Sequence, residues 1–172
     1  QVSLISAVAL TGRAPYEGVL THGFVMDGEG LKMSKSRGNV VSPQEVIEKF
    51  GADVLRLWVF SSQYGEDVRI SDEILQRTAD AYRKIRNTFK YLLGNLYDFK
   101  PKDAVAVKEL LEVDRWALSR LAGLLQKVTE VMEDFEFHKG YQFIYQFCVV
   151  EMSSFYLDIL KDRLYTLKSD AL

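Results

Sequence analysis

Residues 22–46 read HGFVMDGEGLKMSKSRGNVVSPQEV, and this stretch says more about the fold than any other part of the chain. Its centre is a short run of lysines and hydroxyl groups, Lys32, Met33, Ser34, Lys35 and Ser36. Lysine carries a compact charge on a flexible stem, so Lys32 and Lys35 are able to follow phosphate oxygens whose charge changes during a reaction. The run predicts a cationic loop that grips a polyphosphate, although a solvated surface loop has the same composition.

Helix, strand and turn signals precede this loop. Apolar residues at helical spacing over 2–9, closed by Gly12, predict a helix. Residues 18–24 then contain Val, Leu and Phe and predict a short strand. Asp-Gly followed by Glu-Gly at 27–30 favours positive φ angles, so we expect the backbone to reverse there and residues 31–33 to form a brief return strand.

Helix signals follow the loop. Ser42 suits an N-cap, Pro43 the first helical position and Glu45 a capping box, so a helix begins here. This helix ends at Gly51, and the next one carries much apolar surface, namely Val54, Leu55, Leu57, Trp58 and Phe60. Because such a helix must be covered on several sides, we expect Trp58 in the core and not against a ligand.

A short strand at 68–70 and three long amphipathic repeats occupy the rest of the chain. Ser71 caps the first repeat, and apolar side chains recur every three or four residues over 74–96, 113–135 and 141–159. Long helices with short connections indicate an antiparallel bundle, and its aromatic stripe follows the core face. We expect one apolar face of this bundle to remain exposed, which favours self-association.

Four motifs in a fixed order resemble the signature region of class I aminoacyl-tRNA synthetases. They are HGF at 22–24, DGEGLKMSKSRGN at 27–39, GAD at 51–53 and LRLW at 55–58. The later sequence narrows the resemblance to isoleucyl-tRNA synthetases of the bacterial type, in preference to their valyl neighbours. It comprises IRNTFKYLLGNL at 85–96, VDRWAL at 113–118 and MSSFYLDILKDRLYT at 152–166.

The resemblance implies a mainly α fold in two parts. Residues 1–70 would be the C-terminal end of the nucleotide-binding α/β catalytic domain, with the KMSKS loop and a small α/β stem-contact segment. Residues 71–172 would be a partial antiparallel helical bundle from the anticodon-binding domain. The family's His-x-Gly-His signature is absent, because His22 and His138 are the only histidines. We therefore expect an internal fragment of a larger enzyme that is inactive by itself.

The resemblance also implies the reaction of the parent enzyme. Isoleucyl-tRNA synthetases activate isoleucine with ATP and attach it to tRNA(Ile). Lys35 and Lys32 would be the catalytic residues that stabilise charge on the leaving pyrophosphate, and Gly38 would let the loop swing. The implied ATP-binding residues are His22, Gly23, Lys32, Met33, Ser34, Lys35 and Ser36. For His22, a place near the adenylate and a buried capping role remain equally open.

Metal chemistry has little support in the sequence. Mg²⁺ is expected with ATP, but Asp27, Glu29 and Asp53 are too scattered to be assigned as ligands. Cys148 is the single cysteine, which excludes a cysteine zinc cluster and an intramolecular disulfide. Its apolar neighbours predict a small buried side chain, and a free thiol suits a reducing cytoplasm.

Charge and hydropathy bear on partners and location. The formal net charge of −2 does not by itself indicate a protein that binds nucleic acid, so any contact with tRNA must come from a local basic patch. The candidate patch is Arg83, Lys84, Arg86 and Lys90, which an ordinary solvated helix face explains as well. Neither a signal peptide nor an apolar run of about 18 residues is evident, so we expect a cytoplasmic protein that does not span a membrane. We expect the parent enzyme to be a monomer.

Three other interpretations stay open. The chain is alternatively a non-catalytic tRNA-binding helical module, which would account for the missing half of the ATP site. It is alternatively part of the sister valyl enzyme, because the amino-acid pocket lies mostly outside these residues. The third interpretation, an unrelated nucleotide-binding α protein that shares the lysine loop by coincidence, is the least favoured. All four motifs occur in the order typical of class I synthetases.

Overall fold

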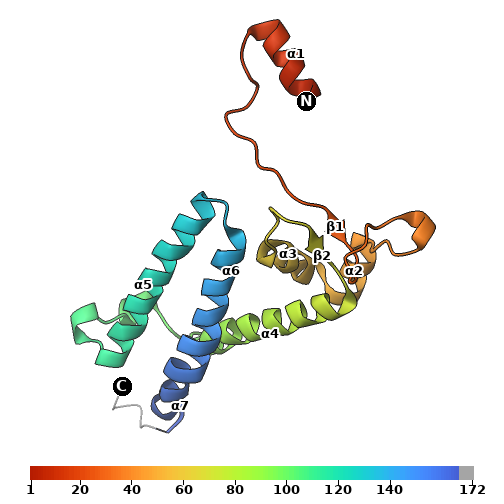
Figure 1. Cartoon of the computed structure of the whole chain (residues 1–172). Coiled ribbons are helices and arrows are strands. Elements are labelled where there is room, and N and C mark those ends of the chain that lie inside the picture. The colour runs from red at the N-terminus through yellow and green to blue at the C-terminus, as the bar shows by residue number, and fades with distance from the viewer. Residues whose placement is uncertain (167–172) are drawn as a thin grey trace.

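The computed structural model describes residues 1–166, which form a mainly helical structure as the sequence predicts (Figure 1). The helices are α1 (Val2–Thr11), α2 (Pro43–Phe50), α3 (Ala52–Ser61), α4 (Asp72–Gly94), α5 (Glu112–Glu133), α6 (Phe137–Gln146) and α7 (Leu157–Tyr165). The strands β1 (Val25–Met26) and β2 (Val68–Arg69) are short and pair in parallel. A π-helical segment, Phe147–Tyr156, joins α6 to α7, and 3₁₀ turns cover Lys35–Arg37, Pro101–Asp103 and Val107–Glu109.

The first hydrophobic cluster lies where α2, α3, β2 and the beginning of α4 meet. Its buried members are Val46, Trp58, Ile70 and Leu75. Trp58 is 7% exposed, which confirms its predicted place in the core. The cluster supports the strand pair, in which Val25 lies opposite Val68. The beginning of the lysine loop therefore stands on a packed base.

The second hydrophobic cluster holds α5 against the run that continues from α6 into α7. Its buried members are Ala117, Met152 and Leu157, with Tyr91 and Leu92 of α4 packed against it. Figure 1 shows α5 and α6 side by side in opposite directions, as the sequence predicts, whereas α4 crosses the C-terminal run. The predicted antiparallel packing thus holds for α5 and α6, and α4 lies across the π-helical segment between α6 and α7.

A buried carboxylate ties α5 to the end of the C-terminal run. Asp114 accepts hydrogen bonds from the Tyr156 hydroxyl at 2.9 Å and from the Arg163 guanidinium at 2.9 Å. Burial and the Asp114 carboxylate raise the pKa of Tyr156 to about 12. An ion pair this sheltered needs both partners, since removal of one would leave an uncompensated charge.

The π-helical segment is a feature that the apolar repeat did not predict. Its buried positions Cys148 and Met152 are four residues apart, and Leu157 at the start of α7 follows five residues later, a spacing that suits i→i+5 hydrogen bonding better than a strict α-helix. Hydroxyl groups satisfy its carbonyl oxygens, because Thr88 and Ser153 both donate to Cys148 O, at 3.3 and 2.8 Å. Cys148 is buried as predicted, and burial raises the pKa of its thiol.

The α5–α6 corner closes the fold by contacting α3. The rings of Phe60 and Phe137 stack with centroids 6.0 Å apart, and the Tyr64 hydroxyl donates to Phe135 O at 2.7 Å. Phe135 has a φ of 59°, which is uncommon for a residue other than glycine and permits the tight turn between α5 and α6. The two clusters are therefore joined through this corner as well as through α4.

The run Phe137–Tyr165 is, by length and composition, able to cross a membrane, and 22% of its most apolar window is buried here. This run packs against α3, α4 and α5. Core helices of soluble proteins meet the same criterion of length and hydropathy, so the helix carries no membrane assignment.

Two expectations about local structure were wrong. Residues 18–24 form no strand, and the extended pairing begins only at Val25. The predicted capping box is not formed, because Ser42 is the N-cap of α2 without a side-chain hydrogen bond. The first helix ends at Gly12 as predicted, with a φ of 70°, but α1 stands away from the body and buries none of its residues (Figure 1).

The division between residues 70 and 71 remains a prediction, and residues 167–172 of the second predicted part lie outside the described residues. The helix α4, which begins just after this division, contributes Leu75 to the first cluster and Tyr91 to the second. The helix α4 therefore contributes side chains to both hydrophobic clusters.

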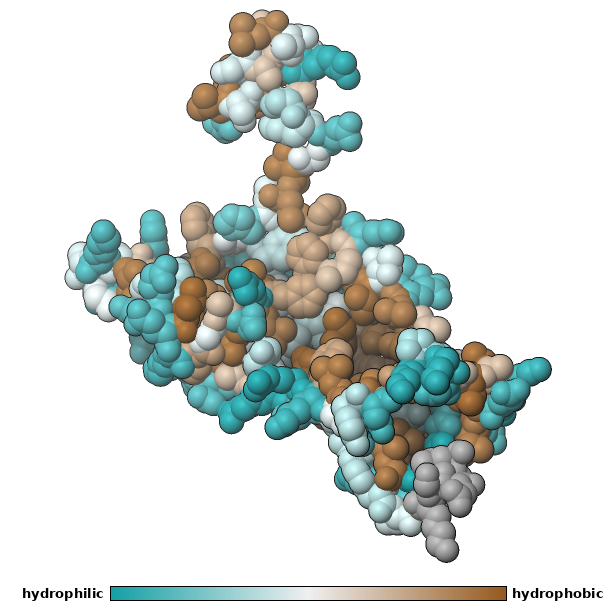
Figure 2. Space-filling model, turned by 180° about the vertical axis from the view of Figure 1, so that it is seen from behind, coloured by the Kyte–Doolittle hydropathy of each residue, from teal (hydrophilic) through white to brown (hydrophobic). Residues whose placement is uncertain are grey.

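Exposed apolar side chains are numerous and lie on several elements, and the single exposed face predicted for the bundle stays a prediction. Figure 2 shows hydrophobic surface on α1 and across the face of the body that is seen from behind. Prominent examples are Val2, Leu10, Phe24, Leu93 and Tyr97, each more than half exposed. Self-association of the isolated chain stays a prediction that such surface favours.

We predict that Leu75→Ala lowers the free energy of unfolding by about 2–5 kcal/mol, because Leu75 is 1% exposed and its removal leaves a cavity. Leu93→Ala on the same helix is the matched control and should change stability by less than about 0.5 kcal/mol, since Leu93 is 67% exposed. Urea unfolding followed by circular dichroism and tryptophan fluorescence measures both. Equal losses for the two variants would contradict the placement of the first cluster.

Candidate functional site

The lysine loop extends from the β1 end to the beginning of α2. Lys35 opens a 3₁₀ turn, Lys35–Arg37, that ends at Gly38 with a φ of 68°. The Lys32 and Lys35 side chains are exposed, and among residues 1–166 neither ammonium group is found in an ion pair. Two cations are thus presented to solvent from a short, turned backbone. This arrangement suits the recognition of phosphate oxygens.

A carboxylate–amide pair, Asp27 and Asn39, holds the two ends of the loop together. Asp27 Oδ2 accepts a hydrogen bond from Asn39 Nδ2 at 2.8 Å. Asn39 Oδ1 in turn accepts from the Ser34 N–H at 2.9 Å, and Asn39 Nδ2 also donates to Lys32 O at 3.3 Å. One side chain therefore binds the backbone on both sides of Met33.

The other oxygen of Asp27 orders the turn that leads into the loop. Asp27 Oδ1 accepts from the N–H groups of Glu29 at 3.0 Å and Leu31 at 2.8 Å. The hydrogen bond from Asn39 and that from the Leu31 N–H lower the pKa of the Asp27 carboxyl below its usual range. The predicted reversal and return strand are confirmed in reduced form, as an antiparallel bridge between Met26 and Lys32.

The sequence did not support Asp27 as a metal ligand, and it indicated no role for Asn39. Their connection is a contact between side chains twelve positions apart, which no local periodicity reveals. The available signal was the Asp-Gly turn, since Asp side chains commonly bind backbone N–H groups two residues on.

The predicted ATP-binding residues His22 and Gly23 lie just before β1. His22 is exposed, so a buried capping role is excluded, and its Nδ1 lies 2.8 Å from Gly23 O. The Gly23 N–H donates to Tyr64 O at 2.8 Å. A Cβ at this position would lie 2.2 Å from Glu66 O, so the close approach of two backbones explains why glycine stands here.

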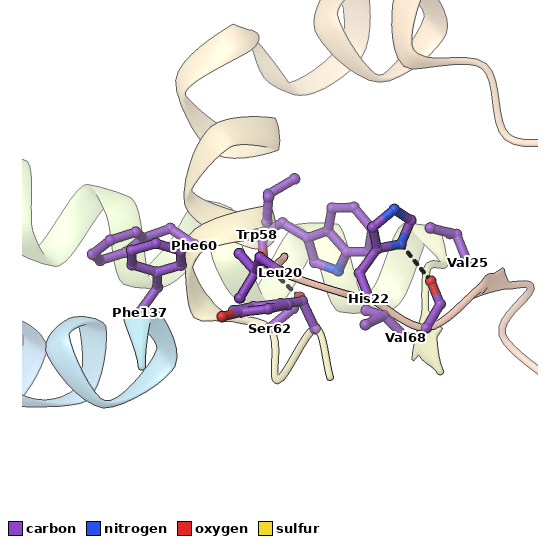
Figure 3. Close-up of a pocket in the computed structure, with 11 residues that line it drawn as sticks. Leu20, His22, Val25, Trp58, Phe60, Ser62, Val68 and Phe137 are labelled. Atoms are coloured by element: carbon purple, nitrogen blue, oxygen red, sulfur yellow. Dashed lines mark hydrogen bonds between the residues drawn. The ribbon is translucent and has the colours of Figure 1, made fainter. Parts of the chain in front are cut away.

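An apolar pocket of about 450 Å³ lies beside these residues, between β1, β2, α3 and the beginning of α6. Figure 3 shows Phe60 and Phe137 at one end and His22 with Val25 at the other. Trp58 and Val68 also line it. The structure thus brings His22 to a concave apolar surface, whereas Lys32 and Lys35 do not line this pocket.

The basic residues predicted to bind tRNA are all exposed on α4, and two of them make contacts within the chain. On α4, Arg83 pairs with Asp80, while Lys84 contacts the Tyr145 hydroxyl at 3.1 Å and lies over its ring. Arg86 and Lys90 are exposed. The local pairing of Arg83 is what a solvated helix face produces, and the contact of Lys84 with α6 is structural.

The described residues offer no grouped metal ligands. Across residues 1–166 no three His, Cys, Asp or Glu side chains gather in a way that would hold an ion. Asp27 borders the lysine loop, and both of its carboxylate oxygens accept hydrogen bonds, from the Asn39 amide and from backbone N–H groups.

Two protein-family models match the chain. Residues 1–71 match the model described as tRNA synthetases class I (I, L, M and V), and residues 114–171 match the anticodon-binding domain of tRNA ligase. The first match contains the lysine loop, and the second covers α5, α6 and α7.

Over the aligned residues, curated relatives are identical to the chain at more than half of the positions. An isoleucine–tRNA ligase from Caldanaerobacter subterraneus subsp. tengcongensis is 62% identical over 96% of the chain and 18% of its own length. One from Caldicellulosiruptor saccharolyticus is 57% identical over 100% of the chain and 19% of its own length. The chain thus spans less than a fifth of the relatives that it matches.

A solved structure shares the fold. The crystal structure of a LeuRS–tRNA–LeuAMS ternary complex from Agrobacterium radiobacter matches with a TM-score of 0.68 at 24% identity. It covers 89% of this chain and 20% of that protein. At this identity the likeness concerns the arrangement of helices and strands alone.

We predict that Gly23→Ala destabilises the β1–β2 pair by about 1–3 kcal/mol, because the added Cβ would displace the Glu66 backbone. Gly18→Ala is the matched control, since a Cβ there meets nothing within 4 Å. Urea unfolding of the two variants gives the comparison. If Gly23→Ala were as stable as Gly18→Ala, the tight backbone contact would be refuted.

Proposed function

The chain belongs to the isoleucyl-tRNA synthetases of class I, and from this premise we propose that it carries the KMSKS loop and tRNA-facing helices of an enzyme that activates isoleucine with ATP. The enzyme then transfers the isoleucyl group to tRNA(Ile). The isoleucine specificity rests on the relatives, which are 62% and 57% identical. We infer a cytoplasmic location, which suits the free Cys148 thiol.

The observation that carries the proposal is the fixed backbone of the lysine loop beneath two exposed ammonium groups. Activation breaks the bond between the α- and β-phosphates of ATP, so negative charge develops on the departing pyrophosphate. Lys35 and Lys32 are able to stabilise that charge, and no acidic group within residues 1–166 is ion-paired with either of them. Met33, Ser34 and Ser36 complete the proposed ATP contact through backbone and hydroxyl groups.

Mg²⁺ would accompany ATP as the counter-ion of its phosphates. Within residues 1–166 the acidic side chains do not converge as a metal site, so no step is assigned to an ion held by this chain. The residues that act here are cationic, and their task is to orient the triphosphate and to offset charge.

The helices α5, α6 and α7 are proposed to face tRNA, in line with the anticodon-binding family model. The α4 residues Arg86 and Lys90 are exposed and remain candidates for phosphate contacts, together with Arg83 and Lys84 in a weaker sense because both are engaged. Contacts with phosphates would show as binding that weakens with salt.

The test of the proposed function is pyrophosphate exchange into ATP by the full-length polypeptide that contains this chain. Isoleucine should support exchange, while valine, leucine and methionine should support it poorly or not at all. Exchange driven best by valine would move the assignment to the valyl enzyme. Binding of tRNA with no exchange for any amino acid would favour the non-catalytic module.

We predict that Lys35→Ala in that full-length polypeptide lowers the activation rate about 100- to 1,000-fold, the usual cost of removing one preorganised electrostatic donor. Lys102→Ala is the matched control, because Lys102 is an exposed lysine in the 3₁₀ turn Pro101–Asp103. The exchange rate at saturating isoleucine and ATP is the measurement. An unchanged rate for Lys35→Ala would remove Lys35 from the catalytic role.

A further inference from the structure

We propose that Asp27 and Asn39 are positioning residues of the activation reaction, because their side-chain pair fixes the backbone from which Lys32 and Lys35 reach the substrate. This inference rests on the proposed function. Neither side chain is assigned to contact ATP. The two side chains affect the reaction by holding the loop backbone that carries Lys32 and Lys35.

The pair connects the strands to the lysines through an unbroken series of hydrogen bonds. β2 holds β1, since Val68 N–H donates to Phe24 O at 2.8 Å and Ile70 N–H donates to Met26 O at 3.0 Å. Asp27 follows β1 directly and binds Asn39, which binds the Ser34 N–H. Ser34 is the residue before the 3₁₀ turn that begins at Lys35.

Asn39 suits this role because it donates and accepts at the same time. Its amide NH₂ faces Asp27 and the Lys32 carbonyl, while its amide oxygen faces the Ser34 N–H. An aspartate at 39 would set two carboxylates against each other. An asparagine at 27 would set two NH₂ groups against each other, and a flip of Asn39 would then turn its NH₂ toward the Ser34 N–H.

The double exchange Asp27→Asn with Asn39→Asp restores complementarity. The asparagine introduced at position 27 would keep its oxygen for the Glu29 and Leu31 N–H groups and point its NH₂ at the new carboxylate. The second oxygen of that carboxylate would accept from the Ser34 N–H. The 3.3 Å bond to Lys32 O is lost, and a carboxylate oxygen faces that carbonyl instead. Each single variant is thus mismatched, whereas the double variant is matched, which a non-specific effect on folding does not produce.

Few charged or polar side chains lie near the Asp27–Asn39 pair, and none of them is changed in the variants. Lys32 belongs to the loop itself, Glu29 belongs to the preceding turn, and Arg69 of β2 places its guanidinium against Gly30. The α4 cap contributes the uncharged Ser71, whose Cβ lies 3.0 Å from the position of a Cβ on Gly28. Comparison with the unmodified protein at each pH therefore isolates the groups at 27 and 39.

We predict that Asn39→Asp lowers the exchange rate of the full-length polypeptide about 10- to 100-fold at pH 8, the range expected when a reacting group is misplaced by about 1 Å. The ratio to the unmodified protein should recover as the pH falls toward about 5, because one of two facing carboxyls binds a proton and donates to the other. Asp27→Asn should be slow at every pH, and the double exchange should be at least tenfold faster than either single variant at pH 8.

The matched control for added charge is Asn87→Asp on α4, where the side chain is exposed and far from the loop in sequence. It should follow the pH profile of the unmodified protein. A structural measurement that needs no activity accompanies it, namely amide hydrogen exchange of Ser34 in the 172-residue chain. Asn39→Ala should speed exchange at Ser34 at least tenfold and leave the Val68 amide, which pairs with Phe24, unchanged.

The outcomes separate the two proposals. If the unmodified full-length polypeptide shows isoleucine-dependent exchange but Asn39→Asp matches it at every pH, the positioning role is refuted and the proposed function stands. A double variant no faster than the single ones would also refute it. If no amino acid supports exchange by the unmodified protein, both proposals fail, while protection of the Ser34 amide still reports whether the pair exists.

Discussion

The helix α4 is the constraint on which the rest of the structure depends. Its 23 residues extend over roughly 35 Å at 1.5 Å per residue, and its two ends belong to different hydrophobic clusters. Leu75 is buried in the first cluster, and Tyr91 and Leu92 pack against the second. A continuous helix is stiff, so the length of α4 sets the separation between the residues that it contributes to the two clusters.

A single shared helix would still leave the two clusters free to rotate about its axis. The α5–α6 corner removes this freedom, because Phe137 stacks on Phe60 and the Phe135 carbonyl accepts from Tyr64. Tyr64 also accepts the Gly23 N–H through its own carbonyl. The segment that precedes β1 and the far helices are thus anchored on the same residue, which couples the site to the helical part through direct contacts.

Much of the helical structure was predictable because a 3.6-residue repeat and a cap are local properties. Ser71 accepts a hydrogen bond from Ile74 N–H as expected, and Trp58 is buried. The Asp27–Asn39 pair and the contact of Gly23 with Glu66 were not predictable, because each joins residues that only the folded backbone brings together. The strand expected at 18–24 failed for a related reason, since β-forming residues need a neighbouring strand for their hydrogen bonds.

The lysine loop combines a fixed backbone with free side-chain ends, and this division follows from where its hydrogen bonds lie. Within the part of the chain that the structure describes, the Asp27 and Asn39 side chains form hydrogen bonds with each other and with backbone groups of the loop, and with no ammonium group. The loss of conformational entropy on ordering this backbone therefore occurs during folding, before an anion binds. The Lys32 and Lys35 side chains are exposed, so they can follow a phosphate whose geometry changes, while Asp27 and Asn39 order the backbone that carries them. A loop built in the opposite way, with lysines paired and backbone loose, would have to break an ion pair and order its chain at the moment of binding.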